Sequence, residues 1–185
     1  MRLRLDPFLM VWLSVQTTVG QINMIIEATQ NDCDVLAKLI RDSFRDVAHR
    51  FSLTKENCPK HPSNCAPSWI EADMSRGVQY YLLYAAENPI GCVAIEKAGA
   101  DLFYLERLSV LPEMRGRHFG IQLVQHAFAC AAAKGARKIG IGIIDAQTDL
   151  KAWYARLGFV VTGAKSFPHL PFTVCLMEFG YDQPA

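Results

Sequence analysis

Between residues 102 and 144 the sequence runs through a strand, a basic turn, a helix and a second strand, and this passage constrains the fold most. LFYLERLSV is apolar and aromatic, VLPEMRGRHFG breaks that pattern with a proline and two glycines, and IQLVQHAFACAAAK has helical composition before KIGIGII. Two strands joined by one helix pair in parallel through a right-handed crossover, which brings the helix start to the carboxyl edge of the sheet. Open α/β sheets bind ligands at this edge, so the passage predicts a mixed sheet and a binding site.

The segments around this passage predict five more strands and three more helices. The segment 54–67 has three prolines and no apolar period, which is typical of a loop, and Ser68 then opens a capping box, Ser-Trp-Ile-Glu. The fold class is α/β (α+β): a mixed, mostly antiparallel sheet of seven strands with helices on both faces. Strands are expected at 24–29, 79–87, 90–98, 159–164 and 171–180, and helices at 32–44, 68–77 and 148–157.

Composition narrows the class of protein. The 185 residues suit one domain, and 51% hydrophobic residues with a net charge of +1 exclude a disordered chain and bulk attraction to nucleic acid. Six cysteines are too few for a disulfide scaffold, and four lie in apolar segments where free thiols pack as small hydrophobes. These features indicate a reducing, cytoplasmic compartment.

Residues 1–23 are expected to form a loosely attached extension before a single domain at 24–185. MRLRLDPFLMVWLSV resembles a secretory signal superficially, but Asp6 and Pro7 interrupt it and its apolar run is too short to span a membrane. The well-patterned part begins at Met24, which is a candidate for the natural initiator. We therefore expect no membrane association.

The basic turn has the chemistry of an anion site. Arg115, Arg117 and His118 are polar and mostly cationic, while Gly116 and Gly120 let the backbone approach a ligand at the helix start. A P-loop is excluded because no Gly-Lys-Ser/Thr is present, and a Rossmann fingerprint would need glycine at both arginine positions.

Two motifs resemble those of the GCN5-related N-acetyltransferase (GNAT) family. Residues 108–120, Leu-Ser-Val-Leu-Pro-Glu-Met-Arg-Gly-Arg-His-Phe-Gly, are similar to its acetyl-CoA motif, Q/R-x-x-G-x-G/A after V-x-P, with His118 where the central glycine is usual. Residues 147–159, QTDLKAWYARLGF, resemble its N-x-x-A-x-x-x-Y-x-x-x-G-F segment, with Gln147 in place of Asn and Leu150 in place of Ala. The expected order of elements from residue 24 to 180 also agrees with the family.

The resemblance implies an acetyl-CoA-dependent N-acetyltransferase that transfers an acetyl group directly to a primary amine in a ternary complex. In the family the turn holds the pyrophosphate, the pantetheine arm pairs with the preceding strand, and a splay between that strand and the next opens the slot. The implied cosubstrate-binding residues are Leu108, Ser109, Val110, Arg115, Gly116, Arg117, His118, Phe119, Gly120, Gln147 and Tyr154.

Two local features carry separate expectations. A histidine at positive φ would cost roughly 1–2 kcal/mol relative to glycine, so we expect His118 to lie in the first helical turn with ordinary dihedrals. Gly140 and Gly142 leave one face of the strand 138–144 without side chains at these positions. This either makes room for the pantetheine arm or permits close packing.

Acetyl transfer needs a base for the amine, donors for the thioester carbonyl and an acid for the leaving thiolate. Backbone N–H groups at 108–110 suit the carbonyl, and the resemblance makes Tyr154 the acid, although a packing role also fits. Glu106 is the best-placed base, on the same strand face as Leu108 by alternation, unless a salt bridge with Arg107 occupies it. Asp145 is a second candidate, and His169 is a candidate substrate contact.

Other interpretations also fit the sequence. A non-catalytic acyl-CoA-binding or sensing module of the same fold is the main alternative. Cys58, His61 and Cys65 could ligate zinc, but the Cys-x-x-Cys spacing and a fourth ligand are missing, so we expect no metal and a mobile loop near the acceptor. This loop, Trp69 and the turn at His169 are expected to set substrate specificity. A homodimer is compatible with the fold, and the sequence does not identify the acceptor.

Overall fold

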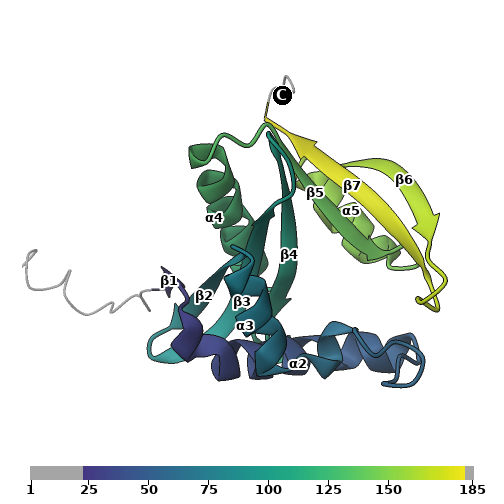
Figure 1. Cartoon of the computed structure of the whole chain (residues 1–185), viewed down its shortest axis with the longest axis horizontal. Coiled ribbons are helices and arrows are strands. Elements are labelled where there is room, and N and C mark those ends of the chain that lie inside the picture. Colours follow the sequence, from purple (N-terminus) through teal and green to yellow (C-terminus); the bar gives the residue numbers. More distant parts are fainter. Residues whose placement is uncertain (1–22, 182–185) are drawn as a thin grey trace, which may run out of the picture.

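The computed structural model describes residues 23–181, and a seven-stranded sheet with the order β1-β2-β3-β4-β5-β7-β6 runs through them (Figure 1). Neighbouring strands pair antiparallel except β4 and β5, which are parallel, as the crossover predicted. The expected fold class and strand number are confirmed. The strands are β1 (Asn23–Glu27), β2 (Gln79–Ala85), β3 (Asn88–Lys97), β4 (Leu102–Val110), β5 (Lys138–Ile144), β6 (Val160–Ser166) and β7 (Thr173–Gly180).

Helices cover both faces of the sheet, and each face has its own core. One core includes Phe103, Leu123, Tyr154 and Phe159 and packs α4 and α5 on the sheet. The second joins α2 and α3 to the first three strands on the opposite face. The helices are α2 (Cys33–Arg50), α3 (Pro67–Ser75), α4 (Phe119–Ala133) and α5 (Thr148–Arg156), with short 3-10 turns η2 (Gln30–Asp32), η3 (Pro62–Asn64) and η4 (Pro112–Met114).

The sheet divides between β4 and β5. These strands pair only at their first residues, and the last pair in register is Tyr104 with Gly140. Beyond that pair they diverge into two arms, and α2 lies across the open end (Figure 1). A Cβ added to Gly140 would lie 2.9 Å from the Tyr104 ring, so this glycine is required for close packing where the arms meet. Gly142 lies further along β5, where the strands have separated.

Two helix boundaries differ from the sequence prediction. α2 continues to Arg50, beyond the expected end near Phe44, because Ala48 and its neighbour Val47 pack in a small third core with Leu53 and Cys58. α3 begins one residue early, with Pro67 in the first turn and Ala66 as the N-cap, so Ser68 is not a cap.

The expected N-terminal extension lies almost wholly outside the described residues, although its last residue, Asn23, already pairs with Ala85 in β1. Within residues 23–181, no helix is both long and apolar enough to cross a lipid bilayer.

Candidate active site

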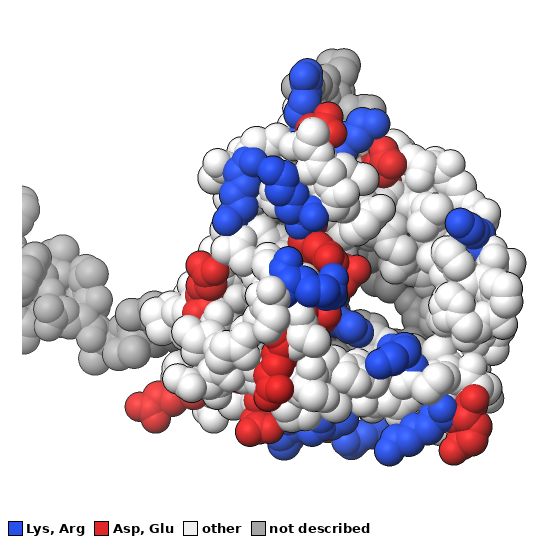
Figure 2. All heavy atoms as spheres, viewed as in Figure 1, with Lys and Arg blue, Asp and Glu red and all other residues white. Residues whose placement is uncertain are grey.

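A cavity of about 1100 Å³ occupies the space between the arms. Its wall brings together the start of α4, the diverging parts of β4 and β5, the start of α5 and the inner side of α2. Figure 2 shows the hollow between the two arms, with basic side chains at its border. The lining includes Ser43, Phe44, Arg50, His61, Glu106, Arg107, Leu108, Ser109, Val110, Arg115, Gly116, His118, Phe119, Gly120, Gly142, Gln147, Tyr154, Leu170 and Phe172.

The side chain of Arg115 fastens the turn to α2. Its guanidinium donates to the carboxylate of Asp46 and to the backbone carbonyls of Ser43 and Val110. Burial alone would raise the pKa of Asp46, but the hydrogen bond and charge of Arg115 outweigh it, so the pKa lies below its ordinary value. The arginine side chain therefore holds the turn in place and keeps few donors for a ligand.

The backbone before α4 is left-handed at two positions. Gly116 has φ +76° and His118 has φ 63° and ψ 7°. The expectation of ordinary dihedrals for His118 is therefore wrong, because His118 is the N-cap and the chain must reverse there before α4 can begin. The family pattern of glycine at this position agrees with that conformation. The first residues of α4, which carry the N–H groups without partners inside the helix, line the cavity, and the turn that leads to them holds His118 in a strained conformation.

A β-bulge interrupts β4 where it borders the cavity. Ala94 pairs with Glu106 and Cys92 pairs with Ser109, so two residues of β4 oppose Val93. Arg107 has φ 54°, and its carbonyl accepts hydrogen bonds from the Ser109 hydroxyl at 2.9 Å and the Cys92 thiol at 3.6 Å. In a planar peptide the C=O and the next N–H point in opposite directions, so the N–H of Leu108 points away from these donors.

The bulge corrects one prediction, that Glu106 and Leu108 share a face of the strand. Glu106 and Leu108 do not share a face: Ala94, opposite Glu106, belongs to the core under α2 and α3, whereas Leu108 packs on the core under α4. Ser109 is 2% exposed as a residue, and its hydroxyl donates to the backbone carbonyl of Arg107, so this side chain is not available to a ligand. Simple alternation along β4 fails because the extra residue shifts the following side chains to the other face.

Glu106 lies in the cavity wall without a close cation. Among residues 23–181 its carboxylate has no hydrogen bond or ion pair, and the nearest carboxylate oxygen to Arg107 is that of Asp73, at 4.0 Å. The salt bridge with Arg107 considered from the sequence is therefore not formed. Burial raises the pKa of Glu106, and the charge of Arg107 only partly opposes this.

Tyr154 lines the same cavity from α5 and is 5% exposed. Its ring makes edge contacts with Trp153 and Phe159, and no other described residue hydrogen-bonds its hydroxyl. Burial raises its pKa well above the ordinary value, so the phenol keeps its proton at neutral pH. A packed ring with an unengaged hydroxyl suits a proton donor as well as a core residue.

Several other candidates lie apart from the cavity. Arg117 is exposed and is not in the wall. Asp145 bonds Lys151, which leaves it poorly placed as a base. His169 is exposed against Phe167, and its neighbours Leu170 and Phe172 line the cavity in its place. The turn at His169 therefore reaches the cavity, but through the apolar residues Leu170 and Phe172.

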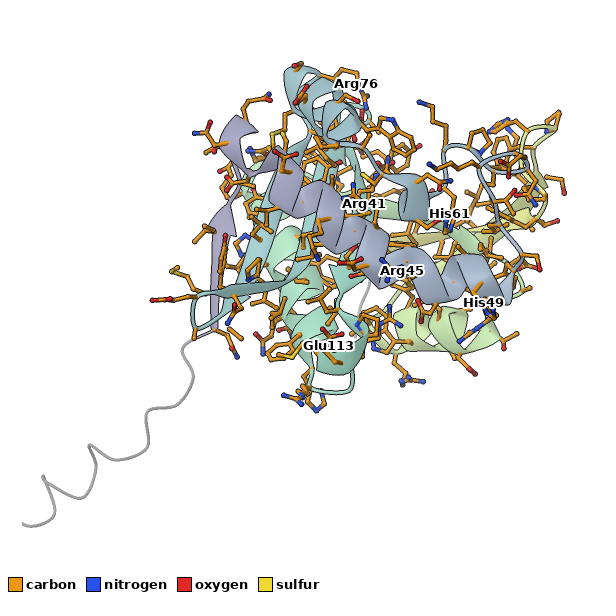
Figure 3. The ribbon with its side chains drawn as sticks, turned by 90° about the horizontal axis from the view of Figure 1, so that it is seen from below. Arg41, Arg45, His49, His61, Arg76 and Glu113 are labelled. Atoms are coloured by element: carbon orange, nitrogen blue, oxygen red, sulfur yellow. The ribbon has the colours of Figure 1, made fainter. Side chains whose placement is uncertain are left out.

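The proline-rich loop brings one side chain to the cavity. His61 is 5% exposed and lies beside α2, as the view from below shows (Figure 3), whereas Trp69 packs against the core under α2 and is not in the wall. Cys58 and Cys65 are buried in different cores, and burial raises the pKa of both thiols. Within residues 23–181 no group of three or more His, Cys, Asp or Glu side chains could hold a metal ion.

From the sequence, His61 is a candidate zinc ligand and part of the specificity loop, and Arg107 is only a candidate partner of Glu106. Two adjacent charged residues, Glu106 and Arg107, inside a mostly apolar strand are the signal that could have identified Arg107. The sheet divides between two parallel strands, and a cavity reaches from a helix start through the division. This is the arrangement that the resemblance to the GNAT family implies for binding of acetyl-CoA.

Comparison with known proteins agrees with the resemblance to the GNAT family. The model of the acetyltransferase (GNAT) domain matches residues 76–161, and the resemblance to the GNAT family is confirmed. A probable glucosamine 6-phosphate N-acetyltransferase 2 of Oryza sativa subsp. japonica is 27% identical over 107 residues, which cover 51% of this chain and 63% of the rice protein.

Solved structures share the fold at low identity. PaiA N-acetyltransferase from Thermoplasma acidophilum, in complex with coenzyme A, has a TM-score of 0.72 at 18% identity and covers 86% of this chain and 99% of its own. The putative acetyltransferase yncA from Salmonella typhimurium, with acetyl-CoA, has a TM-score of 0.64 at 16% identity and covers 88% and 96%. Both neighbours hold the coenzyme.

Proposed function

We propose that the protein is an acetyl-CoA-dependent N-acetyltransferase that transfers an acetyl group to a primary amine within a ternary complex. The observation that carries this proposal is the meeting, in one cavity, of the α4 start, the bulged segment of β4, Glu106 and Tyr154. A module that only binds the coenzyme needs the first two features and has no use for a carboxylate with raised pKa.

In this proposal, main-chain groups of the protein bind the coenzyme. The turn from Gly116 to Gly120 and the first N–H groups of α4 receive the pyrophosphate, helped by the helix dipole. The segment 108–110 of β4 faces the separated β5 and pairs with the pantetheine arm, and the bare Cα of Gly142 leaves room there. The pantetheine arm can pair with this segment because, within residues 23–181, β4 has no strand partner on the β5 side beyond Tyr104.

Three groups of the protein take part in the transfer of the acetyl group. Glu106 accepts a proton from the acceptor ammonium, and the free amine attacks the thioester carbonyl carbon. The N–H of Leu108, fixed by the bulge, donates to the carbonyl oxygen as negative charge develops. The carbon–sulfur bond then breaks, and Tyr154 donates its proton to the leaving thiolate. The attacking nitrogen gives its second proton to the Tyr154 phenolate as the amide forms, and Glu106 later releases the first proton to solvent.

The test is a screen for thiol release from acetyl-CoA across small amines, amino acids, amino sugars, antibiotics and peptides. The rice relative's name makes an amino sugar phosphate one member of this screen. Acetylation of a primary amine, identified by mass spectrometry, supports the proposal. Tight binding of acetyl-CoA with no turnover on any amine would favour the sensing module instead.

A further inference from the structure

The cavity wall near α2 contains unmatched hydrogen-bond donors. Among residues 23–181, two buried side-chain polar atoms have no hydrogen-bond partner: Ser43 Oγ and Arg107 Nε. Ser43 is on α2 and Arg107 is in the bulge of β4, yet both residues line the same cavity. Buried polar groups without partners are rare in folded proteins, and two in one wall indicate that a ligand completes the site.

In the described part of the chain, Arg107 has no carboxylate at close hydrogen-bonding distance. Burial would lower its pKa, but four neighbouring groups raise it: Tyr80, Cys65, Glu106 and Asp73. Its side chain is 19% exposed, and the oxygen of Asp73 lies 4.0 Å away. The two carboxylate oxygens of Asp73 already accept hydrogen bonds from Arg76 and from the Tyr80 hydroxyl. The side chain of Arg107 is mostly buried and its ion pair with Asp73 is long, so an anion brought by a ligand can stabilise the guanidinium further.

His61 adds a third donor to this wall. The backbone N–H of Ser63 donates to Nδ1 of His61, so in the neutral ring the proton lies on Nε2. Burial and the charge of Arg107 lower the pKa of His61 to about 4, which keeps the ring neutral. No described residue accepts from Nε2, which leaves it free to donate to a ligand.

The remaining wall limits the size and shape of a ligand. Phe44, Leu170 and Phe172 supply apolar surface, and the carboxylate of Asp46 is occupied by Arg115. Glu106 is the carboxylate next to this set of donors. The arrangement therefore offers one proton acceptor for an amine beside several donors for oxygen atoms.

We infer that the acceptor is a small primary amine that also carries an oxyanion, a carboxylate or a phosphate, bound by Arg107 with Ser43 and His61. The inference rests on the proposed function, and it names the chemical class of its second substrate. Glu106 faces the amino group, and the oxyanion neutralises the guanidinium.

Paired acceptors test this in the unaltered protein. The pairs are amino acids with their amides, and an amino sugar phosphate with the unphosphorylated sugar, compared by kcat/KM for thiol release from acetyl-CoA. One well-placed charged contact predicts at least a tenfold preference for the anionic member. Equal or better use of the neutral members overturns the inference and leaves the N-acetyltransferase proposal intact. The two kinds of pair distinguish a carboxylate from a phosphate.

A variant separates the anion site from catalysis. In Arg107→Met the preference within each pair should disappear, while Arg107→Lys should keep a part of it. Arg45→Met, an exposed arginine of α2 that is not in the wall of this cavity, is the control and should leave the preference unchanged. Calorimetry with the anionic acceptors measures binding without turnover: saturable binding that Arg107→Met abolishes supports the site, and its absence in the wild-type protein overturns it.

Discussion

The hydroxyl of Ser109 donates to the carbonyl of Arg107 at 2.9 Å and holds the β4 bulge in the orientation that turns the next N–H away from the core. Ser109 is 2% exposed, so this contact is shielded from water. Arg107 has φ 54°, a conformation that costs a non-glycine residue about 1 kcal/mol or more and persists only where the surroundings impose it. A side chain that does not reach the cavity thus determines the direction of the proposed carbonyl donor.

Ser109→Ala should lower kcat without changing the KM for acetyl-CoA. Removing the donor leaves the Arg107 carbonyl with only the weak Cys92 thiol at 3.6 Å, and the peptide that carries the Leu108 N–H becomes less well fixed. We expect a loss of about tenfold in kcat. Ser109→Cys retains a donor and should recover part of it, whereas an alanine variant as active as wild type would exclude the positioning role.

His118→Gly should raise the free energy of unfolding by up to about 1 kcal/mol. Glycine removes the strain of φ 63°, and the greater freedom of the unfolded chain offsets part of the gain. Because the histidine is exposed, little packing is lost. Urea denaturation measures the change, and acetyl-CoA affinity measured beside it should stay constant if the backbone alone holds the pyrophosphate.

Gly116→Ala is the matched control for backbone strain. A Cβ at this position would meet no atom within 4 Å, so φ +76° is the only source of cost, and we expect a loss of about 1 kcal/mol. A histidine variant that is destabilised while the alanine variant is unaffected would contradict the strain argument.

The order of elements could be predicted from the sequence because hydrophobic periodicity and glycine stops are local signals. The bulge could not, since Glu-Arg-Leu-Ser contains no glycine to mark the residue with left-handed backbone. The docking of Arg115 on Asp46 joins residues 69 positions apart, a separation that no local pattern reports. The histidine in the glycine position of the acetyl-CoA motif was a usable sign of left-handed backbone, and the motif itself favoured that conformation.

Tyr154→Phe should lower kcat by about 100-fold, as expected for loss of a general acid, with little effect on stability. The hydroxyl has no described hydrogen-bond partner, so its removal leaves the packing of the ring intact. Tyr181→Phe is the control, because its hydroxyl donates to the Phe128 carbonyl at 2.6 Å and lies outside the cavity wall. That variant should lose about 1 kcal/mol of stability and keep its activity. Unchanged turnover in Tyr154→Phe would leave only the packing role.

Glu106→Gln should abolish most of the turnover and stabilise the protein at neutral pH. Burial raises the pKa of Glu106 in the folded state, so the folded protein binds this proton more tightly than the unfolded chain does. The sign follows: stability falls as the pH rises from the ordinary glutamate pKa, about 4.3, through the raised value, and it stays lower above it. The glutamine side chain does not ionise, so the variant does not lose this stability as the pH rises.

Urea unfolding at pH 4 and pH 7 measures the effect: the stability difference between variant and wild type should be larger at pH 7. Glu113→Gln, on the exposed η4 turn, should show no such difference. The activity of the wild type should rise with pH as Glu106 loses its proton, and in the glutamine variant this limb of the kcat/KM profile should vanish. A variant that keeps the same limb would assign the base to another group.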